Sequence, residues 1–238
     1  MSKLPAQVNL VIAFSTRRHG DMSLYYGGIS EALNNRRDFL SSLGIDYRDL
    51  VCARQIHGDR VRYATEEDKG SGANSYGGSI PDTDAFITDK KNVPIAVFTA
   101  DCLSIFIYDP KTPSIGLVHA GWRSSKKKIV SKAISLMQAK FNTKPQDFYV
   151  GFGSSIRGCC CEVSSDFKSY FSDGLTEKNG RFYLDLAGLN KNELLTLGLK
   201  EENIFPPQDC TFCHNDAFFS YRKEGLACGR QMSVIMLK

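Results

Sequence analysis

Short apolar runs alternate with amphipathic stretches along most of the chain. In the middle of the chain the apolar runs are nearly continuous, which is typical of strands buried on both faces. We expect strands at residues 8–14, 50–56, 60–64, 85–88, 95–99, 104–108, 115–119, 148–152, 183–186, 218–221 and 233–237. The irregular spacing argues against a doubly wound sheet, so the pattern predicts an α/β (α+β) fold with mixed β-sheets flanked by helices.

Helical periodicity appears in four stretches between these runs. It predicts helices at residues 31–43, 126–141, about 165–171 and 190–197. The clearest is 126–141, for which Ser124 or Ser125 is the expected N-cap because a hydroxyl there can accept a backbone N–H. Gly44 and Gly198 are expected to end the first and the last of these helices.

Residues 69–79 have no hydrophobic periodicity and read KGSGANSYGGS. A stretch so rich in Gly and Ser predicts a mobile surface loop, either a lid beside a site or a tolerated insertion. The chain shows no other composition break, no repeat and no linker. We therefore expect one domain over residues 1–238.

Composition and charge exclude several classes of protein. The 238 residues are 42% hydrophobic and 24% charged, which is ordinary for a globular protein. A net charge of +4 is too small to indicate a nucleic-acid partner. No apolar run is long enough to predict a membrane span, and the N-terminus does not read as a signal peptide. We expect a cytoplasmic protein whose eight cysteines are thiols or thiolates.

Three residues with metal-binding side chains stand where predicted apolar strands begin or end. They are His57, Cys102 and His119, and Asp101 directly precedes the cysteine. Two imidazoles and a thiolate suit zinc with an open fourth position. The same residue types also occur as hydrogen-bonded or packed structural side chains. A third reading pairs Cys102 with His119 as an activated nucleophile.

The remaining cysteines offer weaker patterns. Residues 159–161 are consecutive cysteines, whose side chains would alternate in an extended chain, so we do not expect all three to share one metal. Cys210, Cys213 and His214 match the haem-attachment pattern C-x-x-C-H, and with Cys228 they could form a structural zinc site. A reduced, metal-free loop is the default expectation.

Several arginines lie near predicted element ends, where a guanidinium could grip a phosphate or simply face solvent. They are Arg36, Arg54, Arg123, Arg222 and Arg230. Trp122 follows His119 closely and is expected either to form a wall of the cleft or to anchor the core.

Six motifs together resemble one family. They are RQIHGDRV (54–61), DTDAFIT (82–88), FTADCLSIFIYD (98–109), GLVHAGWR (116–123), IRGCCCEV (156–163) and CTFCHNDAFFSYRKEG (210–225). The chain is similar to the YfiH family, also called the laccase-domain or polyphenol oxidase family and regarded as purine nucleoside phosphorylases. The resemblance covers nearly the whole chain. The sequence departs from the family pattern at Ser104, Ser124, Ser154 and Cys161, which affects loops around the cleft and therefore substrate preference.

The resemblance implies a fold also likened to cysteine hydrolases and one zinc per chain on His57, Cys102 and His119, with copper as the alternative metal. It implies phosphorolysis of adenosine, guanosine and methylthioadenosine, together with adenosine deamination. The substrates would be purine nucleosides and phosphate.

Further roles follow for four residues near these motifs. We expect Asp101 to orient substrate or shuttle a proton, Gln55 to orient substrate, and Arg36 and Arg222 to bind phosphate. One rival function is a Cys-His hydrolase or amidase that edits peptidoglycan precursors. Another is a copper-dependent polyphenol oxidase (laccase), for which four histidines in the whole chain are few. A non-enzymatic binding module is the third.

Overall fold

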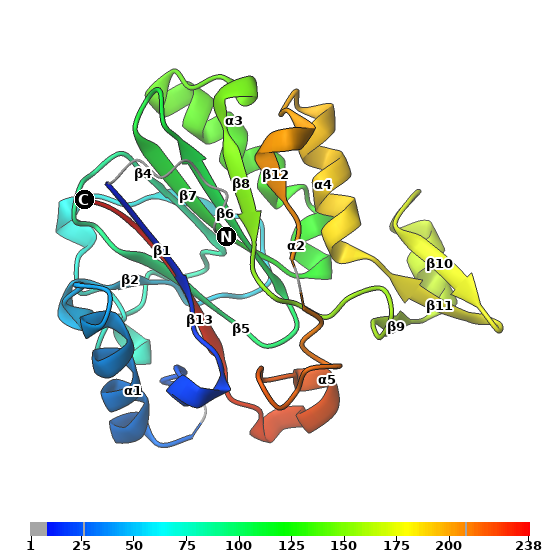
Figure 1. Cartoon of the computed structure of the whole chain (residues 1–238), viewed down its shortest axis with the longest axis horizontal. Coiled ribbons are helices and arrows are strands. Elements are labelled where there is room, and N and C mark those ends of the chain that lie inside the picture. Colours follow the sequence, from blue (N-terminus) through cyan, green and yellow to red (C-terminus); the bar gives the residue numbers. More distant parts are fainter. Residues whose placement is uncertain (1–8, 26, 208) are drawn as a thin grey trace.

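The computed structural model describes residues 9–25, 27–207 and 209–238. Its strands form three sheets in this part of the chain (Figure 1). The largest has the order β12-β8-β6-β7-β4-β3. Its strands are β3 (Val61–Tyr63), β4 (Ala85–Thr88), β6 (Leu103–Asp109), β7 (Ser114–Ala120), β8 (Tyr149–Phe152) and β12 (Ile204–Phe205). The central pairs are antiparallel and the two edge pairs are parallel, so the predicted mixed sheet is confirmed.

Two smaller sheets accompany the large one. The first has the order β1-β13-β5-β2 and consists of β1 (Leu10–Phe14), β2 (Val51–Cys52), β5 (Ile95–Thr99) and β13 (Gln231–Leu237). The second contains β9 (Glu162–Val163), β10 (Leu175–Lys178) and β11 (Arg181–Leu184), and it extends from one side of the molecule (Figure 1). Val8 of the predicted first strand lies outside the described residues.

The large sheet is buried on both faces, as its continuous apolar strands predict. In β6, Ile105 and Ile107 join the core under the helices, while Phe106 and Tyr108 join the core against the four-stranded sheet. This division follows from the two-residue period of a strand. The covering helices are α3 (Ile129–Phe141) and α4 (Leu186–Thr196), and α1 (Ile29–Ser41) covers the far face of the four-stranded sheet (Figure 1).

The predicted helix at 126–141 is in fact two helices. They are α2 (Trp122–Lys126) and α3, and they are separated at Lys128, whose φ of 61° interrupts the helical backbone. Ser124 and Ser125 lie buried inside α2 and its N-cap is Gly121, so the predicted serine cap is wrong. The chain turns at this glycine directly after β7, which starts the helix one turn earlier than the periodicity indicated.

The predicted strand at 218–221 is absent. The backbone N–H and C=O of Phe219 hydrogen-bond the side-chain amide of Gln231 instead of a neighbouring strand. The short helix α5 (Tyr221–Glu224) follows at once. Two consecutive phenylalanines therefore gave the pattern of a strand, although a side chain satisfies the backbone hydrogen bonds of this segment.

Residues 69–79 do not form a simple surface loop. Ala73 is fully buried, and Arg36 Nη1 donates to the carbonyls of Gly72 and Ala73, each at 3.0 Å. A single 3₁₀ turn covers Tyr76–Gly78. The prediction missed this anchoring because the buried arginine comes from α1, far away in the sequence. Across the described part of the chain, no helix has the length and apolar character needed to cross a bilayer.

Candidate metal centre

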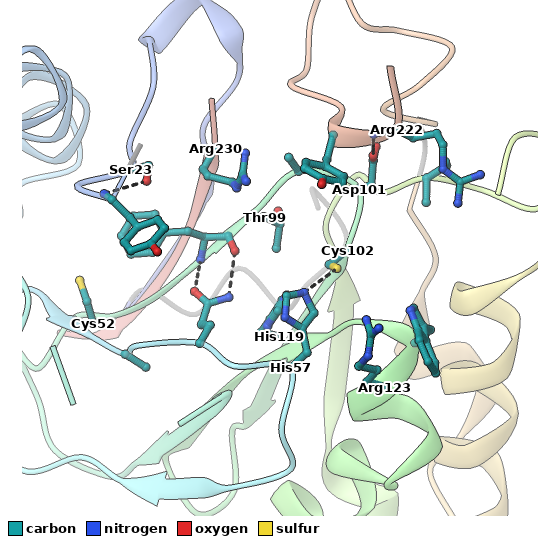
Figure 2. A pocket seen from close by; sticks show the side chains of 18 of the residues that line it. Ser23, Cys52, His57, Thr99, Asp101, Cys102, His119, Arg123, Arg222 and Arg230 are labelled. Carbon is teal, nitrogen blue, oxygen red and sulfur yellow. Dashed lines mark hydrogen bonds between the residues drawn. The ribbon is translucent and has the colours of Figure 1, made fainter. Parts of the chain in front are cut away.

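The structure brings His57, Cys102 and His119 together. One ligand atom from each lies within 4.8 Å of the other two, and His57 Nε2 is 3.8 Å from Cys102 Sγ (Figure 2). Cys102 directly precedes β6 and His119 lies near the end of β7, which is the neighbouring antiparallel strand. The register therefore places the start of one strand beside the end of the other, as the strand-end argument predicted.

The turn that follows His119 permits this close approach. A side chain at Gly121 would place its Cβ 2.9 Å from His57 Cδ2 and 3.1 Å from Cys102 Sγ. Both distances are shorter than an ordinary packed contact, so any other residue would push into the two ligands. Gly121, the second glycine of the GLVHAGWR motif, thus leaves room for the two ligands.

A buried carboxylate that sequence reasoning missed organises the centre. Asp84 accepts hydrogen bonds from the backbone N–H groups of Ile56, His57 and Gly58, at 3.2, 3.0 and 2.7 Å. It also bonds His119 Nδ1 at 2.8 Å. One side chain therefore holds the His57 turn and fixes His119 so that its Nε2 faces the other ligands. Its position in the DTDAFIT motif, just before a strand, was the available signal.

Electrostatics in the centre favour a thiolate. Burial raises the pKa of the Cys102 thiol, but hydrogen bonds and charge from His119 and His57 outweigh it and lower the pKa to about 6. Burial lowers the pKa of His119, but the bonds to Asp84 and Cys102 raise it to about 9. A sulfur that is ready to carry negative charge suits a soft divalent metal or nucleophilic chemistry.

The three residues fit a metal ion by donor type and by access. Zinc in catalytic sites takes three nitrogen, sulfur or oxygen ligands and leaves a position for water or substrate. His119 is buried, whereas His57 and Cys102 keep contact with solvent. The open side of the centre faces a cavity of about 680 Å³.

Basic and aromatic side chains make up about a third of the lining of this cavity. Figure 2 shows Arg123 and Arg222 on one side of the centre and Ser23 and Cys52 on the other. The basic members of the lining are Arg36, Arg123, Arg222 and Arg230, and the aromatic ones are Tyr25, Tyr76, Phe98, Trp122 and Tyr221. Trp122 is therefore part of the cleft wall, although it also packs against the core cluster beside α3.

The four arginines of the cavity are held in different ways. Arg36 is almost fully buried, and its Nε and Nη1 donate to the carbonyls of Met22, Gly72 and Ala73. Arg222 Nη1 donates to the Glu162 carbonyl at 2.8 Å. Arg230 Nη1 donates to the carbonyls of Cys228 and Gly229.

Arg123 differs from them. Its guanidinium lies 4.2 Å from the centre of the Trp122 ring, and among the described residues it has no hydrogen-bonding partner. Arg54, the fifth arginine singled out in the sequence, forms an exposed ion pair with Asp82 and does not line the cavity.

The two remaining predicted site residues also line the cavity. Asp101 is mostly buried, and its carboxylate accepts from the Thr211 hydroxyl at 2.7 Å and from the Arg222 N–H at 2.6 Å. Gln55 forms two hydrogen bonds with the backbone of Phe98, one through each side-chain polar atom. Both side chains thus hold neighbouring segments in place around the centre.

Comparisons with known proteins identify the family of the chain. A family model described as multi-copper polyphenol oxidoreductase laccase matches residues 16–238. The chain is 30% identical over 244 residues to a protein named purine nucleoside phosphorylase YlmD from Geobacillus stearothermophilus, covering 94% of this chain and 89% of that protein. It is 29% identical over 248 residues to one named adenosine deaminase RL5, from an unknown prokaryotic organism, covering 96% and 94% respectively.

Solved structures give the same answer for the fold. The crystal structure of YlmD from Geobacillus stearothermophilus matches with a TM-score of 0.94 at 29% identity, over 99% of this chain and 94% of that one. The structure of the hypothetical protein YfiH from Bacillus licheniformis matches with a TM-score of 0.92 at 28% identity, over 96% and 93%. The chain therefore belongs to the family described as multi-copper polyphenol oxidoreductase laccase, which is the YfiH family that its motifs resemble.

Proposed function

We propose that the chain is a zinc-dependent purine nucleoside phosphorylase that also deaminates adenosine. The observation that carries this proposal is the trio of His57, Cys102 and His119 in a cavity that is lined by four arginines. The cavity volume of about 680 Å³ lies in the range of small-ligand sites. Two relatives bear the names of these two activities, which adds support from outside the chain.

Zinc on the three ligands would supply a positive centre that polarises an oxygen of phosphate or acidifies a water molecule. The surrounding residues would bind and orient the reactants. Aromatic rings of the lining suit a purine base because they offer flat apolar surfaces. Arginines suit phosphate because a guanidinium donates two parallel hydrogen bonds to it.

We assign the main phosphate contact to Arg123. The guanidinium of Arg123 has donors to spare among the described residues, whereas Arg36 already donates to three carbonyls. Arg222 borders the same side of the centre and is proposed as a second contact (Figure 2). Under this proposal Arg36 and Gln55 shape the wall of the cavity rather than hold the substrate.

Asp101 is proposed to orient the reactants at the centre. Its carboxylate is adjacent to Cys102 in sequence and is held by Thr211 and by the backbone of Arg222. In deamination the same carboxylate would shuttle the proton to the leaving amine. In phosphorolysis its fixed position would keep Arg222 and the 210–222 segment against the cavity.

A chromatographic assay tests the reaction. Purified protein is incubated with adenosine, with and without phosphate, and adenine, inosine and ribose 1-phosphate are measured. We expect adenine and ribose 1-phosphate only when phosphate is present, and inosine in both conditions. Equal adenine release without phosphate would identify a hydrolase, and no product in either condition would refute both activities.

The assignment of Arg123 has its own test. Arg123→Gln removes a charged hydrogen-bond donor to phosphate, which costs about 1.5–3 kcal/mol, or roughly ten- to hundredfold in phosphate-dependent turnover. Deamination, which uses no phosphate, should change much less. Arg54→Gln is the matched control, because that arginine is paired on the surface outside the cavity. Parallel loss of both activities in the Arg123 variant would contradict a phosphate-specific role.

A second candidate function rests on the Cys102–His57 contact of 3.8 Å. A thiol with its pKa lowered to about 6, beside an imidazole, has the features of a Cys-His hydrolase such as an amidase. The two candidates differ in their need for metal. Removal of metal with a chelator should abolish phosphorolysis and deamination, whereas a thiolate nucleophile would keep its activity.

A further inference from the structure

Four cysteine sulfurs form a second cluster outside the His57 centre. Cys159, Cys160, Cys210 and Cys213 have Sγ atoms that all lie within 4.8 Å of one another. Cys213 Sγ is 3.3 Å from Cys160 Sγ and 3.8 Å from Cys159 Sγ. Cys159 and Cys160, the first pair, follow β8. Cys210 and Cys213, the second pair, follow β12, so the cluster joins two segments about fifty residues apart in the chain.

A tight turn brings the two adjacent cysteines to the same side. The N–H groups of Cys160 and Cys161 both donate to the Arg157 carbonyl at 2.9 Å, and residues 158–160 form a turn. The expectation that the three consecutive cysteines would not all share one metal assumed an extended chain, in which side chains alternate. The turn removes that alternation, so the Sγ atoms of Cys159 and Cys160 lie in the same cluster, whereas Cys161 is not part of it.

The second pair is also held in place by backbone contacts. Thr211 N–H donates to the Ser155 carbonyl at 3.1 Å, which ties the C-x-x-C segment to the strand end before the first pair. Arg157 N–H donates to Cys210 Sγ at 3.4 Å. Backbone donors aimed at a sulfur stabilise the thiolate form that metals bind.

The spacing of the sulfurs agrees with one tetrahedral zinc ion. Zinc–sulfur bonds of about 2.3 Å at tetrahedral angles separate the four sulfurs from one another by about 3.8 Å. Cys210 is buried, whereas Cys159 and Cys213 are exposed, so an ion can enter from solvent. All four are free thiols in the structure.

We propose that Cys159, Cys160, Cys210 and Cys213 form a structural zinc site. Four thiolates fill the coordination shell of zinc, so this site would leave no position for substrate. The ligand set differs from the one the sequence suggested. His214 is not among the clustered side chains, and Cys228 Sγ lies elsewhere, bonded to the Gly229 carbonyl and near Glu224.

The proposed zinc would fasten one wall of the main cavity. Thr211, next to Cys210, donates its hydroxyl to Asp101. Ile156 and Cys161, on either side of the first pair, line the cavity itself. Loss of this zinc should therefore loosen the Asp101 side of the His57 centre as well as lower the stability of the fold.

Zinc counting in matched variants tests the proposal. Elemental analysis of protein purified under reducing conditions should give two zinc equivalents for the wild type. His57→Ala/Cys102→Ser, which removes two ligands of the first centre, should retain one equivalent. Cys210→Ser/Cys213→Ser should lose one equivalent. Cys161→Ser and Cys228→Ser, which change cysteines outside the cluster, should keep both.

Cobalt substitution identifies the ligands even if the double serine variant does not fold. The His57→Ala/Cys102→Ser protein loaded with Co²⁺ should show the strong sulfur-to-cobalt absorption of a four-thiolate site. No metal in this variant, together with one equivalent in the wild type, would overturn the proposal. A disulfide between Cys160 and Cys213 in the reduced preparation, found by thiol counting and peptide mapping, would also overturn it.

The zinc count also distinguishes a failure of the four-cysteine site from a failure of the proposed function at the His57 centre. If the His57 centre binds no metal, the wild type should hold a single zinc that the His57→Ala/Cys102→Ser variant keeps. That result would support the four-cysteine site and at the same time remove zinc from the proposed activity.

Discussion

The geometry of the His57 centre depends most on the carboxylate of Asp84. Burial raises its pKa, but hydrogen bonds from His119, Gly58 and Ile56 outweigh that effect and hold the pKa below its usual value. A buried carboxylate ion is stable only when such donors replace the lost water. The same bonds set the direction of His119, so the charge of Asp84 and the position of the metal ligand depend on each other.

Asp84→Asn should weaken zinc binding at this centre. An amide has one oxygen acceptor in place of two, so it cannot serve His119 and the three backbone donors equally well. We expect about a 10- to 100-fold loss of affinity, as is common when a residue that orients a metal ligand is changed. Competition with a chromogenic chelator measures it, on protein that lacks Cys210 and Cys213 if the second site is present.

Asp82→Asn provides the control for that measurement. Asp82 stands two residues away in the same motif, but it is exposed and forms a surface ion pair with Arg54. Its affinity for zinc should match the wild type. An Asp84→Asn protein with unchanged affinity would show that His119 is oriented without the carboxylate.

Glu224 is the last residue of α5, and its side chain accepts several hydrogen bonds. Its Oε1 bonds Arg17 at 2.6 Å, Asn215 at 2.7 Å and the Ser220 N–H at 2.9 Å. Burial raises its pKa, but the bonds from Ser220, Asn215 and Arg17 prevail and lower the pKa below its usual value. The ion pair therefore adds stability above the unfolded pKa of about 4.3, and this contribution disappears as the pH falls through the lower folded value.

Glu224→Gln should reduce the free energy of unfolding by about 1–2 kcal/mol at pH 7, since charged hydrogen bonds become neutral ones. The difference from wild type should shrink as the pH falls below 4. Urea unfolding at pH 7 and pH 3.5 measures both values. Glu202→Gln, at an exposed position, is the control. A difference that is the same at both pH values would mean that packing rather than charge is responsible.

At the scale of elements, α1 holds residues 69–79 through Arg36. The guanidinium of Arg36 lies 4.5 Å from the centre of the Phe98 ring and donates to the carbonyls of Met22 and Gly72. A residue of α1 therefore connects Phe98 on β5 with a segment that has little hydrophobic contact of its own. The arrangement explains how a Gly- and Ser-rich stretch can have a buried alanine at its centre.

Arg36→Met keeps an unbranched side chain over Phe98 but removes the hydrogen bonds to three carbonyls. Leaving those acceptors unsatisfied should cost about 2–4 kcal/mol of stability. Limited proteolysis should cut within residues 69–79 faster than in the wild type. Arg37→Met is the control, because that neighbour is exposed. Equal cutting rates would show that the segment is held by other contacts.

At the scale of the whole molecule, the two larger sheets pack through an apolar core, and small polar residues form a further contact between them. Ser104 Oγ on β6 bonds Ser233 Oγ on β13 at 2.7 Å. Gly153, just after β8, lies beside this pair. A Cβ there would be 3.0 Å from the ring of Phe14 on β1 and in steric overlap with Ser104 Oγ. The contact between sheets therefore has no space for an additional methyl group.

Gly153→Ala should destabilise the protein by about 1–3 kcal/mol, as overpacking of a buried contact usually does. Adding Ser104→Ala should recover part of the loss, because it removes the nearest overlapping atom. Thermal unfolding of both single variants and the double variant gives the coupling energy. Additive effects would mean that the two sheets shift apart instead of clashing at Ser104.

Features that depend on near neighbours in the chain were predictable from the sequence. Nearly continuous apolar runs indicated strands that are buried on both faces, and the trio was chosen because its members stand where strands begin or end. Both inferences depend on the period of a strand and on the chemistry of single side chains. The helix boundary at Lys128 was not predicted because it depends on a backbone turn. The strand at 218–221 was predicted wrongly because the side chain of Gln231 hydrogen-bonds the backbone there.

Features that join distant segments needed the tertiary structure. Asp84 acts on residues 27 and 35 positions away, and the sulfur cluster joins cysteines 53 and 54 positions apart. Arg36 looked like a phosphate-binding side chain, but its donors are taken up by carbonyls from other elements. Hydrogen-bond partners and metal ligands are chosen by distance in space, and only the packed sheets and turns determine which residues meet.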